Sequence, residues 1–297
     1  MRRKPMQGVR DEIKYLIERH NPEYFYIIDD SFLARPEQEI NEFIEMYKEF
    51  QLPFWFNTRP ENVTEERLSL LKSINCDRIS FGLECGNEEF RQKIVQRHPT
   101  NEEIVRYFDI IADSRIAFSV NNIIGFPDET REMIFETIEL NRRLHGYDSL
   151  TVSIFTPYHG TKMREMAVER GYLNPDVITT HTTSTSLLDM PQLSANEIDK
   201  LVRAFTLYVK FPKSEWPNIK IAEEDTPEGA KQFARFQERY REQFFRGNQD
   251  DGMEDWDAPT EYSVTPQSDT DAPEEPWGFN CGSDQRQYAV RPNDPND

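Results

Sequence analysis

The chain has 297 residues, of which 37% are hydrophobic and 30% charged, a composition typical of a folded protein with an apolar core. Its formal net charge is −19, and residues 249–297 hold 13 acidic and 2 basic residues, a net charge of −11, which argues against nucleic acid as a partner. No apolar run reaches the roughly 20 residues that cross a bilayer, and the start M-R-R-K-P-M-Q is not a secretory signal, so we expect a cytoplasmic protein without a membrane partner.

Hydrophobic spacing predicts alternating helices and strands between residues 9 and 170. The first element is a helix over residues 9–20, ended by Asn21-Pro22. The strands are expected at residues 24–28, 53–57, 78–84, 117–124 and 150–155, with a helix between each pair. A helix–strand unit recurs about every thirty residues, which indicates an α/β fold with a parallel sheet and right-handed crossovers.

The rest of the chain differs in pattern. An irregular connector from Tyr172 to Pro191 precedes further helices, the first of which begins at the capping box formed by Ser194 and Glu197. Beyond Gly247 both periodicities end, and the composition is that of a disordered segment. We therefore expect an α/β core over residues 1–171, a helical extension over 172–246 and a disordered acidic tail over 247–297.

Polar residues stand at the ends of four predicted strands. They are Asp29, Asp30 and Ser31, then Asn57 and Arg59, then Glu84, and then Asn121 and Asn122 before the Gly125 of G-F-P-D-E-T. Because the carboxyl ends of parallel strands meet at one edge, these groups are expected to surround one site. Taken singly, each also suits a helix cap, a turn or a surface ion pair.

Other kinds of site find less support. The five histidines form no H-x-H or H-E-x-x-H group, there is no G-x-S-x-G motif, and the 12 glycines form no phosphate loop. The three cysteines, Cys76, Cys85 and Cys281, are spaced neither as a metal site nor as a disulfide framework, and are expected to be reduced thiols. A barrel enzyme that binds a divalent ion through strand-end carboxylates stays open as an alternative.

Six segments, in this order, resemble the radical SAM superfamily. They are R-R-K-P-M-Q-G-V-R-D-E-I, F-Y-I-I-D-D-S-F, F-W-F-N-T-R, L-L-K-S-I-N-C-D-R-I-S-F-G-L-E-C-G, I-I-G-F-P-D-E-T and P-Y-H-G-T-K-M-R-E-M-A. The resemblance covers about residues 2–210 and is nearest to the branch whose members often carry a cobalamin-binding domain. It implies a partial (β/α)6 TIM-like barrel, here without its first strand, that binds S-adenosylmethionine (SAM) at the carboxyl ends of its strands.

The resemblance also implies cofactor contacts, although it identifies no catalytic residue. The implied SAM-binding residues are Asp29, Asp30, Ser31, Arg59, Glu84, Asn121, Asn122, Ile123 and Gly125. The first three fall where backbone carbonyls meet the methionine amino group, and Glu84 falls where a polar side chain meets the ribose or the methionine part. The strand with the two asparagines backs the adenine, and Arg59 is expected to pair with the SAM carboxylate.

Members of this family also hold a [4Fe–4S] cluster through C-x3-C-x2-C, receive electrons from a flavodoxin or ferredoxin, and in some cases use cobalamin. That cysteine motif is absent here, and Cys76 and Cys85 lie nine residues apart and do not replace it. We therefore expect a fragment of a radical SAM enzyme that is inactive as given, with the cluster bound by the full-length protein in radical-based modification or methylation. The alternative is a non-catalytic pseudoenzyme or partner subunit that lacks the cluster. No motif identifies the substrate.

Overall fold

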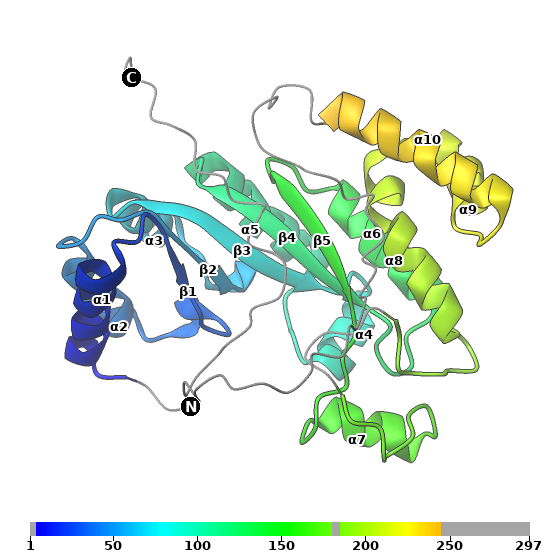
Figure 1. The fold of residues 1–297 in the computed structure, drawn as a ribbon, viewed down its shortest axis with the longest axis horizontal. Helices are drawn as coiled ribbons and strands as arrows, with labels where there is room; N and C mark the ends of the chain where they lie inside the picture. Colours follow the sequence, from blue (N-terminus) through cyan, green and yellow to red (C-terminus); the bar gives the residue numbers. More distant parts are fainter. Residues whose placement is uncertain (1–3, 180–184, 245–297) are drawn as a thin grey trace, which may run out of the picture. The chain divides into compact units, whose positions relative to one another are not determined.

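Five parallel strands form one sheet in the computed structural model, in the same order as they occur in the chain (Figure 1). They are β1 (Phe25–Ile27), β2 (Phe54–Thr58), β3 (Cys76–Glu84), β4 (Ala117–Ile124) and β5 (Ser149–Ile154). The structure describes residues 4–179 and 185–244. The predicted parallel sheet is confirmed, and each predicted strand lies within two residues of the observed one.

Helices lie between the strands, as the spacing predicts, and others precede β1 or follow β5. They are α1 (Met6–His20), α2 (Glu37–Tyr47), α3 (Glu65–Ser73), α4 (Glu88–Phe90), α5 (Asn101–Ser114), α6 (Arg131–Arg142), α7 (Lys162–Glu169), α8 (Ala195–Lys210), α9 (Trp216–Ala222) and α10 (Pro227–Phe244). The capping box of Ser194 and Glu197 is present at the start of α8, and a second one, formed by Thr100 and Glu103, begins α5. The short helices α4 and α9 were not predicted.

The helices between the strands cover one face of the sheet. Rings of α2 contact Phe54 on β2, and Phe108 on α5 contacts Phe81 on β3 and Phe118 on β4. Sequential strand order with crossovers of one hand places every such helix on the same side, as in a barrel. The fold is therefore a partial barrel, in which the described helices between the strands all lie on one face of the sheet.

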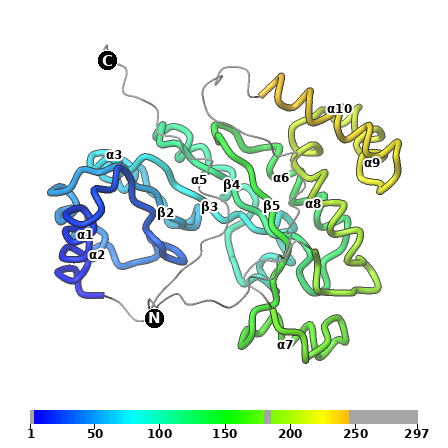
Figure 2. The backbone as a smooth tube through the Cα atoms, viewed as in Figure 1, coloured from blue at the N-terminus to red at the C-terminus, as the bar shows by residue number. Residues whose placement is uncertain are grey.

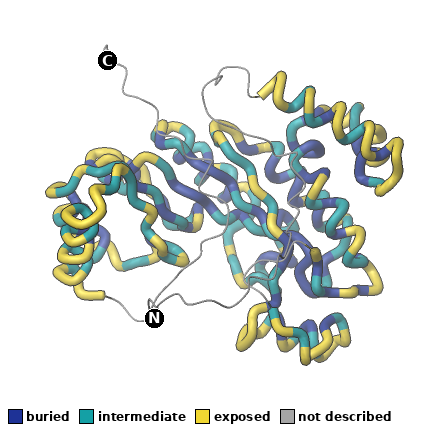
Figure 3. The backbone as a smooth tube through the Cα atoms, viewed as in Figure 1, coloured by how far each residue is buried: buried dark blue, intermediate teal, exposed yellow. Residues whose placement is uncertain are grey.

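Aromatic side chains fill the space between the sheet and its helices. Phe54, Phe56, Phe81 and Phe118 are each at most 1% exposed. Figure 3 shows the same distribution along the backbone, which is mostly buried or half-buried in β2, β3 and β4 and exposed on the outer turns of α1 and α2. Helix α1 lies beside α2 (Figure 2), where Arg10 and Lys14 both pair with Glu49.

The chain divides into two units, Met1–Phe236 and Gln237–Asp297, and the architecture above belongs to the first. Of the second unit the structure describes only residues 237–244, the end of α10. The predicted tail over 247–297 lies outside the described residues, and the boundaries expected at residues 171 and 246 stay predictions. Within residues 4–179 and 185–244, no helix combines the length and the apolarity needed to span a bilayer.

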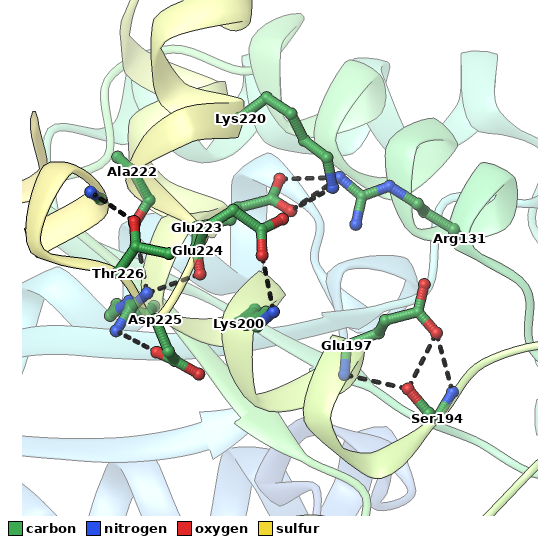
Figure 4. A network of polar contacts seen from close by, with 12 residues as sticks. Arg131, Ser194, Glu197, Lys200, Lys220, Ala222, Glu223, Glu224, Asp225 and Thr226 are labelled. Atoms are coloured by element: carbon green, nitrogen blue, oxygen red, sulfur yellow. Dashed lines mark hydrogen bonds and ion pairs between the residues drawn. The ribbon is translucent and has the colours of Figure 1, made fainter.

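A buried carboxylate joins the C-terminal helices to α6 (Figure 4). Glu223, directly after α9, is 0% exposed, and Arg131 on α6 donates to both of its oxygens at 2.7 and 2.9 Å. Lys220 donates to the same carboxylate at 2.8 Å, and the hydroxyl of Tyr208 on α8 also binds it. Helices α6, α8 and α9 therefore meet at one buried charged cluster, to which α6 contributes its first residue, Arg131.

Candidate functional site

The face of the sheet opposite the helices between the strands carries polar side chains, and Ser80 and Ser119 on it are each only 3% exposed. Since Phe81 faces α5, the period of two along a strand places Ser80 and Gly82 on the opposite side. There the hydroxyl of Ser119 donates to that of Ser80 at 2.8 Å. Two residues further along β4, Oδ1 of Asn121 accepts from the hydroxyl of Thr151 on β5 at 2.9 Å. This face therefore offers hydrogen-bonding groups, where the opposite face offers aromatic rings.

Glu84 lies at the carboxyl end of this face. The pairing of β3 with β4 shifts between Gly82 and Glu84, and Glu84 has a φ of +70°, which marks a bulge at the end of the strand. Its side chain is 15% exposed and its Oε1 lies 3.0 Å from Nη2 of Arg97. Burial raises the pKa of this carboxyl, whereas the charges of Arg97 and Arg59 act to lower it.

Arg97 is the main site residue that the sequence did not reveal. Its guanidinium donates to Oε1 of Glu84 and, through Nη1, to the carbonyl of Gly82 at 2.7 Å. It is brought there by a π-helical turn over Arg91–Val95 and by a left-handed residue, Gln96, after which the amide of Arg97 donates to the carbonyl of Arg91. Burial lowers the pKa of Arg97, and the Glu84 charge opposes that effect.

Arg59 and the residues after β1 lie at neighbouring strand ends. Arg59 follows β2 directly and is exposed, and its charge acts on both Glu84 and Arg97. Ser31 is fixed against the end of β2, because its hydroxyl lies 3.3 Å from Oγ1 of Thr58 and accepts from Asn62 at 3.1 Å. The carboxyl ends of β1, β2 and β3 therefore border one region, as expected of parallel strands.

The two aspartates after β1 differ in their surroundings. Asp29 accepts from the amide of Ser31 at 3.0 Å and pairs with Arg35, so its carboxylate holds the turn after the strand. Asp30 is exposed. A turn role, one of the ordinary explanations open from the sequence, therefore describes the Asp29 side chain.

The two asparagines of β4 face opposite sides of the sheet. Asn121 lies on the face opposite the helices, as does Ile123 two residues later. Asn122 is 1% exposed and exchanges hydrogen bonds with Asn141 on α6, at 2.8 and 3.2 Å. The structure therefore brings Asn121 and Ile123 to the region of Glu84 and turns the Asn122 side chain towards the helices.

A tight turn follows β4. Gly125 has a φ of +84°, and its amide and that of Phe126 both donate to Oε2 of Glu129, at 2.6 and 3.1 Å. Thr130 then caps α6 by accepting from the amide of Met133. G-F-P-D-E-T is thus a turn followed by a cap, and the buried carboxyl of Glu129 is its central group.

The described cysteines do not fit an iron–sulfur cluster. Cys76 begins β3 and Cys85 follows its last residue, so the two lie at opposite ends of the strand, and both are buried. Burial raises the pKa of the Cys85 thiol to about 12, whereas cluster ligands are thiolates. Residues 4–179 and 185–244 contain no group of three Cys, His, Asp or Glu placed to hold a metal ion.

Comparison with known protein families matches the part of the chain that contains the first four strands. Residues 1–140 match the family described as the Radical SAM superfamily. This part of the chain belongs to that superfamily. The radical SAM residues include β1, β2, β3 and β4 with the strand ends described above, so the site lies within the matched region.

Curated relatives extend the comparison. An uncharacterized methyltransferase of Pyrococcus horikoshii is 23% identical over 69% of this chain and 44% of its own length. A tRNA-2-methylthio-N(6)-dimethylallyladenosine synthase of Clostridioides difficile is 27% identical over 38% of this chain and 24% of its own. Among solved structures, the radical SAM enzyme coproporphyrinogen III oxidase of Escherichia coli aligns with 70% of this chain and 48% of its own, at 16% identity and a TM-score of 0.48. The chain thus spans less than half the length of these relatives.

Proposed function

We propose that this chain binds SAM at the carboxyl edge of its sheet, as part of a radical SAM enzyme that modifies or methylates its substrate. The observation that carries the proposal is the Arg97–Glu84 pair, held over Gly82 at the end of β3 and inside the matched region. SAM carries a carboxylate, an ammonium group and ribose hydroxyls. A guanidinium and a carboxylate side by side offer a partner for each of these groups.

The neighbouring strand ends would hold the rest of the molecule. Arg59 adds a second positive charge beside the pair and suits the SAM carboxylate. Asn121 and Ile123 on β4, with the Gly125 turn, lie where the adenosine part would extend from Glu84. Asn122 takes no direct part in this arrangement, because its amide is paired with Asn141.

In radical SAM enzymes a [4Fe–4S] cluster supplies the electron that cleaves SAM. The described cysteines do not fit that cluster, so the chain's own contribution is to bind and orient SAM. Cobalamin and a flavodoxin or ferredoxin reductant belong to the proposal for the whole enzyme. The two curated relatives named above are described as enzymes, which favours an enzyme over a non-catalytic subunit.

Calorimetric titration with SAM tests the proposal. We expect Arg97→Ala to weaken SAM binding by about tenfold or more, since a charged hydrogen bond is worth roughly 1.5–3 kcal/mol, and Arg97→Lys to recover part of the loss. The matched control is Arg106→Ala on α5, whose side chain is 71% exposed and whose pair with Glu103 spans 3.9 Å; it should bind SAM like the parent chain.

Two results would overturn the proposal. One is that the parent chain binds no SAM, and the other is that Arg97→Ala and Arg106→Ala bind SAM equally well. A parallel titration with Mg²⁺ alone separates the divalent-ion alternative, because binding of Mg²⁺ without binding of SAM would favour it. Thermal unfolding of each variant distinguishes a lost contact from a lost fold.

A further inference from the structure

Glu129 is a fully buried carboxyl with a clear backbone task. It is 0% exposed and lies between the end of β4 and the start of α6. Its Oε2 accepts from the amides of Gly125 and Phe126, at 2.6 and 3.1 Å. These two amides belong to the turn that continues the β4 edge of the proposed SAM site.

The other oxygen, Oε1, is buried and has no hydrogen-bond partner among the described residues. The nearby charged side chains are bound to other groups: Asp128 to Arg170, Arg131 to Glu223, Glu132 to Thr130 and Glu197 to Ser194. The thiol of Cys85, at the end of β3, is a further titratable group whose charge interacts with Glu129. Within residues 4–179 and 185–244, no cation pairs with the carboxyl of Glu129.

We propose that Glu129 is a positioning residue, which as a neutral acid holds the Gly125–Phe126 turn in the shape in which the β4 edge receives SAM. The proposal rests on the proposed function, since it assigns this turn to the SAM site. The neutral form follows from the geometry, because a carboxylate buried with one oxygen unsatisfied is costly. Burial accordingly raises the pKa of Glu129 to about 8.

This arrangement links SAM binding to pH. When Glu129 loses its proton, the turn must accommodate an unpaired buried charge or open to water, and either change moves the β4 edge. Titration of Cys85 does not contribute to this pH dependence, because burial raises the pKa of its thiol to about 12 and the thiol stays neutral up to pH 9. The binding-competent fraction falls to about one tenth at one pH unit above the pKa of Glu129, so the apparent affinity falls about tenfold.

The test is calorimetric titration with SAM at pH 6.5, 7.5 and 9.0 on the parent chain, Glu129→Gln, Glu129→Ala and Glu103→Gln. The glutamine keeps an oxygen for both amides and carries no charge. The SAM affinity of Glu129→Gln, relative to that of the control Glu103→Gln, should therefore stay constant from pH 6.5 to 9.0. Alanine removes the acceptor and should weaken binding about tenfold at every pH. Glu103→Gln is the matched control, since Glu103 also accepts a backbone amide, from Thr100 at 2.8 Å, but in a capping box.

The results of these titrations distinguish a failure of the proposed function from a failure of the role proposed for Glu129. Titration of the amino group of SAM itself affects all variants equally, so the difference between variants is the quantity to compare. Absence of SAM binding by the parent chain at any pH would contradict the proposed function. If the parent chain binds SAM but shows the same pH profile as Glu129→Gln, or if Glu129→Ala binds SAM as tightly as the parent, the role of Glu129 is wrong.

Discussion

The carboxylate of Glu84 lies directly over Gly82: a Cβ added to Gly82 would come within 2.3 Å of Oε1 of Glu84. Arg97 donates to the carbonyl of the glycine and to the carboxylate at the same time. The missing side chain of Gly82 thus provides the space in which the ion pair forms. In F-G-L-E the glycine and the glutamate act as one unit.

Gly82→Ala should therefore weaken SAM binding through Glu84. The methyl group meets the end of a flexible side chain, so we expect the carboxylate to leave Arg97 at a cost below about 2 kcal/mol in the free energy of unfolding. Titration with SAM of Gly82→Ala, Glu84→Ala and the double variant checks this mechanism. In the Glu84→Ala background the alanine at position 82 should have no further effect, whereas additive losses would show that it acts elsewhere.

Gly86→Ala is expected to act on the fold itself. A Cβ there would lie 2.3 Å from the Cα of Thr137 and 2.5 Å from the carbonyl oxygen of Glu136, both backbone atoms of α6. Since backbone cannot rotate away, we expect a loss of about 3 kcal/mol or more in urea unfolding.

Gly8→Ala on α1 is the matched control, because nothing lies within 4 Å of its added Cβ and alanine favours a helix. It should gain about 0.5–1 kcal/mol. A Gly86→Ala chain as stable as the parent would show that α6 can shift away from the end of β3.

The sequence predicted the sheet because period-two apolar residues and helical spacing are both local signals. It also indicated Glu84, since a carboxylate ending a buried strand stands out. Arg97 gave no such signal, because its place depends on a π-helical turn and on left-handed Gln96. The same period of two shows that Asn121 and Asn122 face opposite sides, and this inference was available before the structure.

The burial of Glu129 could not be predicted from the sequence in this way. The segment G-F-P-D-E-T has the composition of an ordinary surface turn, so it gives no local sign that its glutamate is buried. The packing of α6 and α8 over the turn encloses Glu129. A Cβ on Gly125 would lie 3.1 Å from the Ile198 side chain of α8, a residue more than seventy positions away. Long-range contacts of this kind decide burial, and no local pattern records them.

The stability of the chain should fall as pH rises from about 5 to above 8, through Glu129. Its pKa is raised from 4.5 to about 8 in the folded state, so the folded protein retains a proton that the unfolded chain has lost. The contribution is complete below pH 4.5 and disappears through pH 8. It amounts to a few kcal/mol, since each pKa unit is worth about 1.4 kcal/mol.

Urea unfolding between pH 5 and 9 measures this dependence. Glu129→Gln should flatten the profile in this range, while Glu103→Gln should leave it unchanged. Burial is the cause of the raised pKa, so salt should have little influence on the slope. An equal slope in the parent chain and in Glu129→Gln would assign the pH dependence to other groups.

The last prediction concerns Arg131 and Glu223. Arg131→Ala removes two hydrogen bonds from a carboxylate that is 0% exposed and leaves it with Lys220 and Tyr208. Removing one partner of a buried pair typically costs about 3–5 kcal/mol, and we expect the lower end here because Lys220 remains. Arg143→Ala is the control, since its pair with Glu102 is exposed and should be worth under about 1 kcal/mol. Comparable losses in the two variants would mean that water reaches Glu223 and that the contact between α6 and α9 is loose. Because Arg131 lies two residues after Glu129, at the start of α6, its loss should also lower SAM affinity, which Arg143→Ala should leave unchanged.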